Sequence, residues 1–106
     1  MAWVYLVVAI LFEVSGTTSM KLSRGFSELW PSAAVFVFYG LSIVFLTLSI
    51  HRIDISIAYA IWSALGTALV ATIGIVHFGE AVTAWKLFFL AVIVLGVVGL
   101  NLSETA

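Results

Sequence analysis

Glu13 is the residue of this 106-residue chain whose surroundings point most directly to chemistry. It is the one charged residue between positions 3 and 20, a stretch that is otherwise apolar or weakly polar. An acidic side chain near the centre of a membrane helix costs roughly 2.5–3.5 kcal/mol, so such residues usually face the inside of a bundle and mark the path of an ion, proton or substrate. The alternative is a neutral glutamate that fixes helix packing through a hydrogen bond.

Small residues share the face of the expected helix that carries Glu13. Ala9 lies four residues before it, and Gly16 and Thr17 lie three and four residues after it. These spacings bring side chains together on a helix surface. Small side chains leave room for a ligand beside the carboxylate. Close packing of a second helix would produce the same pattern, so both interpretations stay open.

Aromatic and hydroxyl side chains in two further apolar stretches fall in the same half of the membrane as Glu13. At a rise of ~1.5 Å per residue, the depths measured from the N-terminal side are ~15 Å for Glu13, ~16 Å for Tyr39, ~12 Å for Ser42, ~6 Å for Tyr59 and ~10 Å for Trp62. Tyr59, Trp62, Ser63 and Gly66 also share one helix face. Aromatic faces beside a carboxylate suit an organic cation. The alternative for each aromatic residue is packing against helices or lipid.

A carboxylate in such a pocket can bind either a proton or a cation. The neutral form is favoured in an empty site because a charge is costly away from water, whereas an arriving cation favours the ionised form. Proton and cation would then compete for Glu13, which is the minimum chemistry for exchanging protons against a cationic substrate. No second acid or metal ligand is expected at this depth, and the chain has no cysteine. We therefore expect a transporter without metal or cofactor rather than an enzyme.

Four apolar stretches must position these residues. Hydrophobic residues make up 64% of the chain, and charged residues only 8%, where a soluble domain carries about a quarter. The stretches cover residues 3–20, 29–50, 55–78 and 82–102, and a helix needs about 20 residues to cross the hydrocarbon core. A net charge of −1 without a basic cluster argues against nucleic-acid binding. The sequence therefore predicts an all-α membrane protein, with one four-helix transmembrane domain over residues 1–106.

The connections between these stretches are short, so each helix is expected to run antiparallel to the next. Glu80, in the third connection, is expected to be solvated. A bundle of four helices is filled by its own side chains and leaves little room for an organic molecule. We therefore expect a dimer, which supplies eight helices and two copies of Glu13.

Two motifs together resemble the small multidrug resistance transporters, and the resemblance covers essentially the whole chain. The first is Glu13-Val14-Ser15-Gly16-Thr17-Thr18-Ser19-Met20-Lys21, followed by Gly25-Phe26 and Leu29-Trp30-Pro31-Ser32; the second is Ile57-Ala58-Tyr59-Ala60-Ile61-Trp62-Ser63. The resemblance implies a multi-pass protein of the bacterial plasma (inner) membrane. It also implies an antiparallel homodimer of four-helix subunits that exports organic cations against protons by alternating access.

The resemblance implies roles for individual residues. Glu13 would bind proton and substrate in turn, and the substrate pocket would be lined by Gly16, Thr17, Tyr39, Ser42, Tyr59, Trp62 and Ser63. Gly66 would act as a helix hinge, and Gly96 and Gly99 would contribute to a dimer contact made by the fourth helix. The chain departs from the family at Ala64 and Phe89, where members often carry glycine. We expect these departures to stiffen the hinge and to change the packing of the dimer contact.

The branch of the family is indicated by a few positions. Members that export guanidinium typically have tryptophan where this chain has Gly16, whereas Tyr39 and Asn101 resemble the drug-exporting branch. We therefore favour export of quaternary ammonium and lipophilic aromatic cations, with guanidinium/proton exchange as the alternative. Two readings from other classes remain: a small regulatory membrane subunit that transports nothing, and a passive ion channel.

Overall fold

The computed structural model describes residues 1–105, and this part of the chain folds into four α-helices. They are α1 (Ala2–Leu22), α2 (Leu29–Ile50), α3 (Ile55–His77) and α4 (Ala84–Thr105). All four are long and apolar enough to cross a membrane, and residues 1–105 contain no strand. The predicted all-α, four-helix membrane architecture is confirmed.

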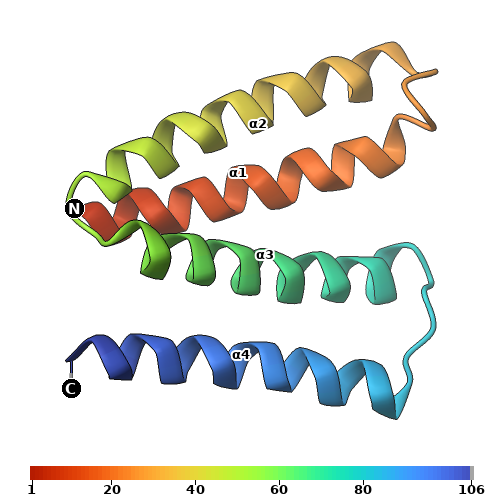
Figure 1. Ribbon diagram of the computed structural model, residues 1–106. Coiled ribbons are helices and arrows are strands. Elements are labelled where there is room, and N and C mark those ends of the chain that lie inside the picture. The colour runs from red at the N-terminus through yellow and green to blue at the C-terminus, as the bar shows by residue number, and fades with distance from the viewer. Residues whose placement is uncertain (106) are drawn as a thin grey trace.

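The helices lie side by side in a single layer, in the order α2, α1, α3, α4 (Figure 1). The extents of 48 × 36 × 16 Å reflect this flat arrangement, since the thinnest dimension is less than two helix diameters of about 10–12 Å each. Successive helices run antiparallel, so the start of α1 and the end of α4 lie at one end of the layer. The α1–α2 and α3–α4 connections lie at the other end, which is called the loop end below.

The centre of the layer is held by α1, which packs against both α2 and α3. Leu6, Ile10 and Val14 follow one another at four-residue spacing, and they are buried in a cluster with Ile57 and Ala58 of α3. On the other side of α1, the buried Ser42 hydroxyl of α2 donates to the Ala9 carbonyl at 2.7 Å. This hydrogen bond requires close approach of the two helices, which the small side chain of Ala9 permits.

Helix α4 stands apart from the first two helices. Within the described chain it packs against α3 but not against α1 or α2. The buried Ala64 lies in this contact, beside a cavity of about 210 Å³ that Asn101 also lines. Phe89 is exposed and stacks on Trp85 at a ring separation of 6.0 Å. Among the described helices, α4 therefore packs against α3 alone.

Local interactions set the ends of α3 and α4. Gly79 has a φ of +69°, a left-handed conformation that glycine adopts without strain. This turn lets the Glu80 N–H donate back to the Gly74 carbonyl at 2.9 Å. The Thr83 hydroxyl accepts the backbone N–H of Lys86 at 3.1 Å and caps α4. For this reason α4 begins at residue 84, two residues later than the apolar run alone suggests.

Candidate functional site

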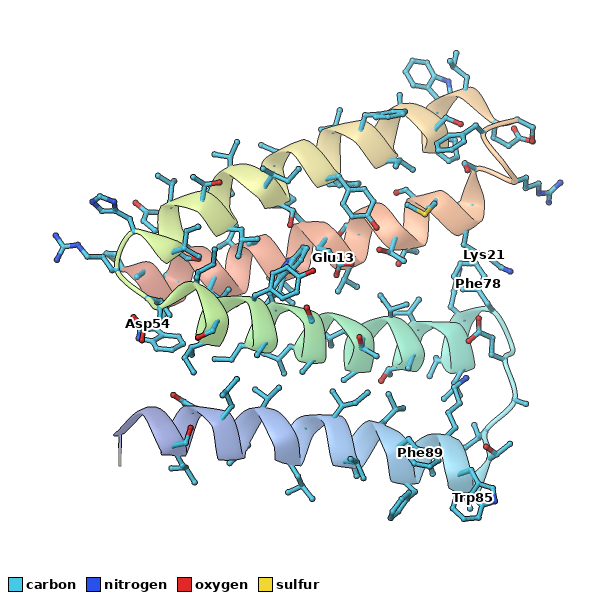
Figure 2. All side chains as sticks on the ribbon, in the orientation of Figure 1. Glu13, Lys21, Asp54, Phe78, Trp85 and Phe89 are labelled. Atoms are coloured by element: carbon cyan, nitrogen blue, oxygen red, sulfur yellow. The ribbon has the colours of Figure 1, made fainter. Side chains whose placement is uncertain are left out.

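The Glu13 carboxylate lies between α1 and α3, near the middle of their length (Figure 2). Its Oε1 atom accepts a hydrogen bond from the Thr17 hydroxyl at 3.1 Å. Its Oε2 atom is buried and makes no hydrogen bond within the described residues. A methyl group on Gly66 would lie 2.7 Å from Oε2, so any larger residue at this position would displace the carboxylate. One oxygen is therefore satisfied, and the other is available to a proton or a cationic ligand.

The hydroxyl of Thr17 joins Glu13 to α2. It forms a short contact with the Tyr39 hydroxyl, in addition to its bond with Glu13 Oε1. Gly16 makes this arrangement possible, because a Cβ atom there would lie 3.1 and 3.2 Å from two ring carbons of Tyr39. The tyrosine ring thus crosses α1 over Gly16 and reaches Thr17. Helix α2 supports the carboxylate indirectly, through this chain of hydroxyl groups.

A cavity of about 420 Å³ opens beside the carboxylate. This volume lies within the range of roughly 300–1,000 Å³ that is usual for small-molecule sites. Its walls combine acidic, hydroxyl, aromatic and small side chains: Glu13, Thr17, Trp62, Ser63, Gly66, Thr67, Val70, Ala71, Glu80 and Lys86. The cavity extends toward the loop end of the layer, because its last two lining residues belong to that end.

Trp62 supplies the aromatic surface of the cavity. Its indole Nε1 is buried and has no hydrogen-bond partner among the described residues. The ring of Tyr59 meets it at a centroid separation of 5.5 Å and an interplanar angle of 64°. An indole face near a carboxylate can bind a cation through its π-system while the carboxylate supplies the counter-charge.

The predicted pocket residues, taken with Glu13 and the predicted hinge Gly66, fall into three groups. Glu13, Thr17, Trp62, Ser63 and Gly66 line the cavity together. Gly16, Tyr39 and Ser42 lie in the contact between α1 and α2, where the tyrosine reaches Thr17 and the serine binds the Ala9 carbonyl. Tyr59 is 58% exposed and is not among the residues that line the cavity, although its ring contacts Trp62.

The two glycines predicted to make a dimer contact lie on the exposed helix α4. A Cβ atom at Gly96 or Gly99 would meet no atom within 4 Å. Both positions are exposed in the single chain. Gly66, the predicted hinge, lies within α3 and is buried.

Several lining residues were missed by the sequence analysis. Thr67 and Val70 follow Ser63 by four and seven residues, so the helical spacing itself could have placed them on the same wall. Glu80 and Lys86 carry no such signal. Glu80 was expected to be solvated; its side chain is 48% exposed, but it also lines the cavity and pairs with Lys86 at 3.5 Å. The left-handed turn at Gly79 brings Glu80 to the cavity, and the spacing of residues in the sequence does not reveal such a turn.

The chemistry of the site centres on the Glu13 carboxylate, which lies in a polar and aromatic setting. Within the residues that the structure describes, no three His, Cys, Asp or Glu side chains are grouped in a way that could hold a metal ion. Among the described residues, one oxygen of the Glu13 carboxylate has no hydrogen-bond partner, and hydroxyl groups and an indole line the same cavity. Such an arrangement can bind and release a proton or hold an organic cation.

Comparison with known proteins yields a family model and several close relatives. The model described as Small Multidrug Resistance protein matches residues 1–93. The chain is 51% identical to the uncharacterized membrane protein YvaE of Bacillus subtilis, over 98% of this chain and 87% of that protein. It is 46% identical to the multidrug resistance protein EbrB of the same organism, over 94% of this chain and 86% of EbrB. It is 41% identical to the quaternary ammonium compound-resistance protein QacE of Escherichia coli, over 98% and 94% of the two chains.

Proposed function

The chain belongs to the Small Multidrug Resistance protein family, and on this premise we propose that it exports hydrophobic and quaternary ammonium cations in exchange for protons. Its four spanning helices and its relatives make it a multi-pass bacterial membrane protein. The relatives named for multidrug and quaternary ammonium resistance place it in the drug-exporting branch. Drug efflux follows from the family, and the exchange mechanism rests on the site.

One observation carries the exchange mechanism: Glu13 Oε2 is buried without a hydrogen-bond partner among the described residues, and Glu13 lines the same cavity as Trp62. A proton on this oxygen removes a charge that would be costly in the membrane. An organic cation supplies a counter-charge for the ionised form and can contact the indole face. Because both ligands use the same carboxylate, binding of one displaces the other.

The export cycle requires the site to open alternately to the two sides of the membrane, and we assign this to an antiparallel homodimer. A single layer of helices leaves the cavity unenclosed, and a second copy would close it. The exposed α4 supports this assignment, since Gly96 and Gly99 allow another helix to approach its backbone. Gly66 would permit α3 to bend beside the carboxylate during the transition.

The setting of Gly16 favours bulky cations over guanidinium. Tyr39 covers Gly16 at near contact distance, so the position that carries tryptophan in guanidinium exporters has no space for a large side chain here. The carboxylate is instead supported by the hydroxyls of Thr17 and Tyr39. The aromatic wall at Trp62 suits lipophilic and aromatic cations.

Transport by purified protein in lipid vesicles tests the proposal. Vesicles with an imposed proton gradient should accumulate labelled tetraphenylphosphonium, and collapse of the gradient should stop uptake. Movement of guanidinium alone would instead establish the guanidinium-exporting alternative. Cation flux that persists without a gradient of protons would indicate a passive channel, and unchanged cation export in a Glu13→Gln variant would remove Glu13 from the mechanism.

A further inference from the structure

The cavity beside Glu13 holds a second carboxylate at its loop end. Glu80, from the α3–α4 connection, lines the same 420 Å³ space as Glu13. Lys86, in the first turns of α4, lines it as well. With Glu13 ionised, the lining carries two carboxylates and one ammonium group. The cavity then has a net charge of −1, which a single organic cation neutralises.

The wall of α3 between the two carboxylates is built from one stripe of residues. Gly66 and Gly74 are eight residues apart, or ~12 Å along the helix axis, with Val70 midway between them. Each glycine lies under a carboxylate: a Cβ atom on Gly66 would collide with Glu13, and one on Gly74 would collide with Glu80. At each end of this wall, a carboxylate therefore lies against the helix backbone at a glycine.

The backbone position of Glu80 is fixed by local structure, but the ion pair of its side chain with Lys86 is weak. The left-handed turn at Gly79 and the hydrogen bond from the Glu80 N–H to the Gly74 carbonyl hold the backbone of Glu80 over α3. The Lys86 Nζ atom lies 3.5 Å from Glu80 Oε1, longer than a strong charge-assisted hydrogen bond. The two side chains are 32% and 48% exposed, so water competes for both charges.

We propose that Glu80 is a second cation-binding group, occupied by the Lys86 ammonium when the cavity is empty and released to the organic cation as it passes between Glu13 and the loop end. This inference rests on the proposed export of cations. This carboxylate gives the cation a counter-charge after it leaves Glu13, before it reaches water. In an antiparallel dimer, one copy of this group would lie toward each side of the membrane.

Transport kinetics of tetraphenylphosphonium in lipid vesicles test the proposal through two substitutions with opposite effects. Glu80→Gln removes the second counter-charge and should raise KM by roughly two- to fivefold, the size expected for a partly exposed charge interaction. Lys86→Met removes the competing ammonium group and should lower KM by a comparable factor. In both variants kcat is measured in the same assay, so that weaker cation binding is separated from a general loss of active protein.

Glu28→Gln is the matched control, since Glu28 is an exposed acid at the same end of the layer and its side chain does not cap α2. A pair that only stabilises the loop would give changes of the same sign in Glu80→Gln and Lys86→Met, and this result would overturn the proposal. A KM for Glu80→Gln equal to that of Glu28→Gln would overturn it too. In either case, loss of export in Glu13→Gln would leave the proposed function standing. Active Glu13→Gln protein would instead refute the proposed function.

Discussion

The carboxylate of Glu13 on α1 packs directly against Gly66 on α3, since a single methyl group on the glycine would lie 2.7 Å from Glu13 Oε2. The contact fixes where this carboxylate oxygen lies against α3. It also makes the position of the acid sensitive to any movement of α3 at this point. Gly66 therefore both contacts the proposed binding group, Glu13, and serves as the proposed hinge of α3.

Replacing Gly66 with alanine should move the carboxylate without unfolding the protein. Alanine favours a helix over glycine by up to about 1 kcal/mol, so the helix itself should not be weakened. The added methyl group, however, must displace Glu13 Oε2. Equilibrium binding of tetraphenylphosphonium should weaken by roughly tenfold, or about 1.4 kcal/mol. Gly40→Ala is the control, since a Cβ there meets no atom within 4 Å; equal affinity in the two variants would contradict the assigned contact.

The sequence was sufficient for the helices and for the identity of the central acid, because both depend on local runs of residues. Lengths of about 20 apolar residues predict spanning helices, and one acid within such a run stands out by its cost. Which helix faces meet is decided by packing over longer distances. Tyr59 shares a face with Trp62 in the sequence, yet it is exposed, whereas Tyr39 reaches Thr17 only because Gly16 lets it pass.

The loop end of the cavity was beyond sequence reasoning for a different physical reason. Glu80 stands in a connection, where no periodic spacing relates it to the helices. Its position over Gly74 depends on a left-handed turn at Gly79 and on the return of α4 beside α3. The sequence shows Lys86 only as a cation near the start of a helix. Its contact with Glu80 becomes visible in the folded chain.

Acidification should weaken cation binding if protons and cations share Glu13. The proton removes the negative charge that the cation requires, so the affinity for tetraphenylphosphonium should fall as the buffer is made more acidic. Glu13→Gln should bind it at least roughly tenfold more weakly, or about 1.4 kcal/mol, and its weak binding should no longer depend on pH. Titration of the purified protein with the labelled cation measures both effects. An affinity that does not change on acidification would argue against competition, and Glu28→Gln should keep the pH dependence of the unmodified protein.

Bulk at Gly96 should disrupt the dimer and leave the subunit intact. A Cβ atom there meets no atom within 4 Å and the position is exposed, so Gly96→Leu should not affect the fold of one subunit. It should separate the α4 helices in a dimer and raise the dissociation constant by at least roughly tenfold. Sedimentation in detergent measures the constant. Gly40→Leu on α2 is the control, because it adds the same side chain at another position where a Cβ meets no atom within 4 Å. A dimer that tolerates leucine at position 96 but not at position 40 would place the contact on α2.

Thr17 should act as the link between Tyr39 and the carboxylate rather than as a separate binding group. Its hydroxyl contacts Tyr39, Glu13 Oε1 and the Glu13 backbone carbonyl, so Thr17→Val removes all three contacts while keeping the shape of the side chain. Loss of one such hydrogen bond costs about 0.5–1.5 kcal/mol, which predicts a fall in tetraphenylphosphonium affinity of roughly two- to tenfold. Thr72→Val is the control, because within the described chain the Thr72 hydroxyl bonds only the Ala68 carbonyl of its own helix, as Thr17 also bonds the Glu13 carbonyl.

A double-mutant cycle with Tyr39→Phe distinguishes a link from two independent groups. If the tyrosine hydroxyl acts through Thr17, it has nothing to support once Thr17 has become valine. The two substitutions together should then weaken binding no more than Thr17→Val alone, with a coupling of about 0.5 kcal/mol or more between them. Effects that simply add would mean that Tyr39 contacts the cation itself. The Thr17–Tyr39 contact would then be a packing feature of α1 and α2, without a part in holding Glu13.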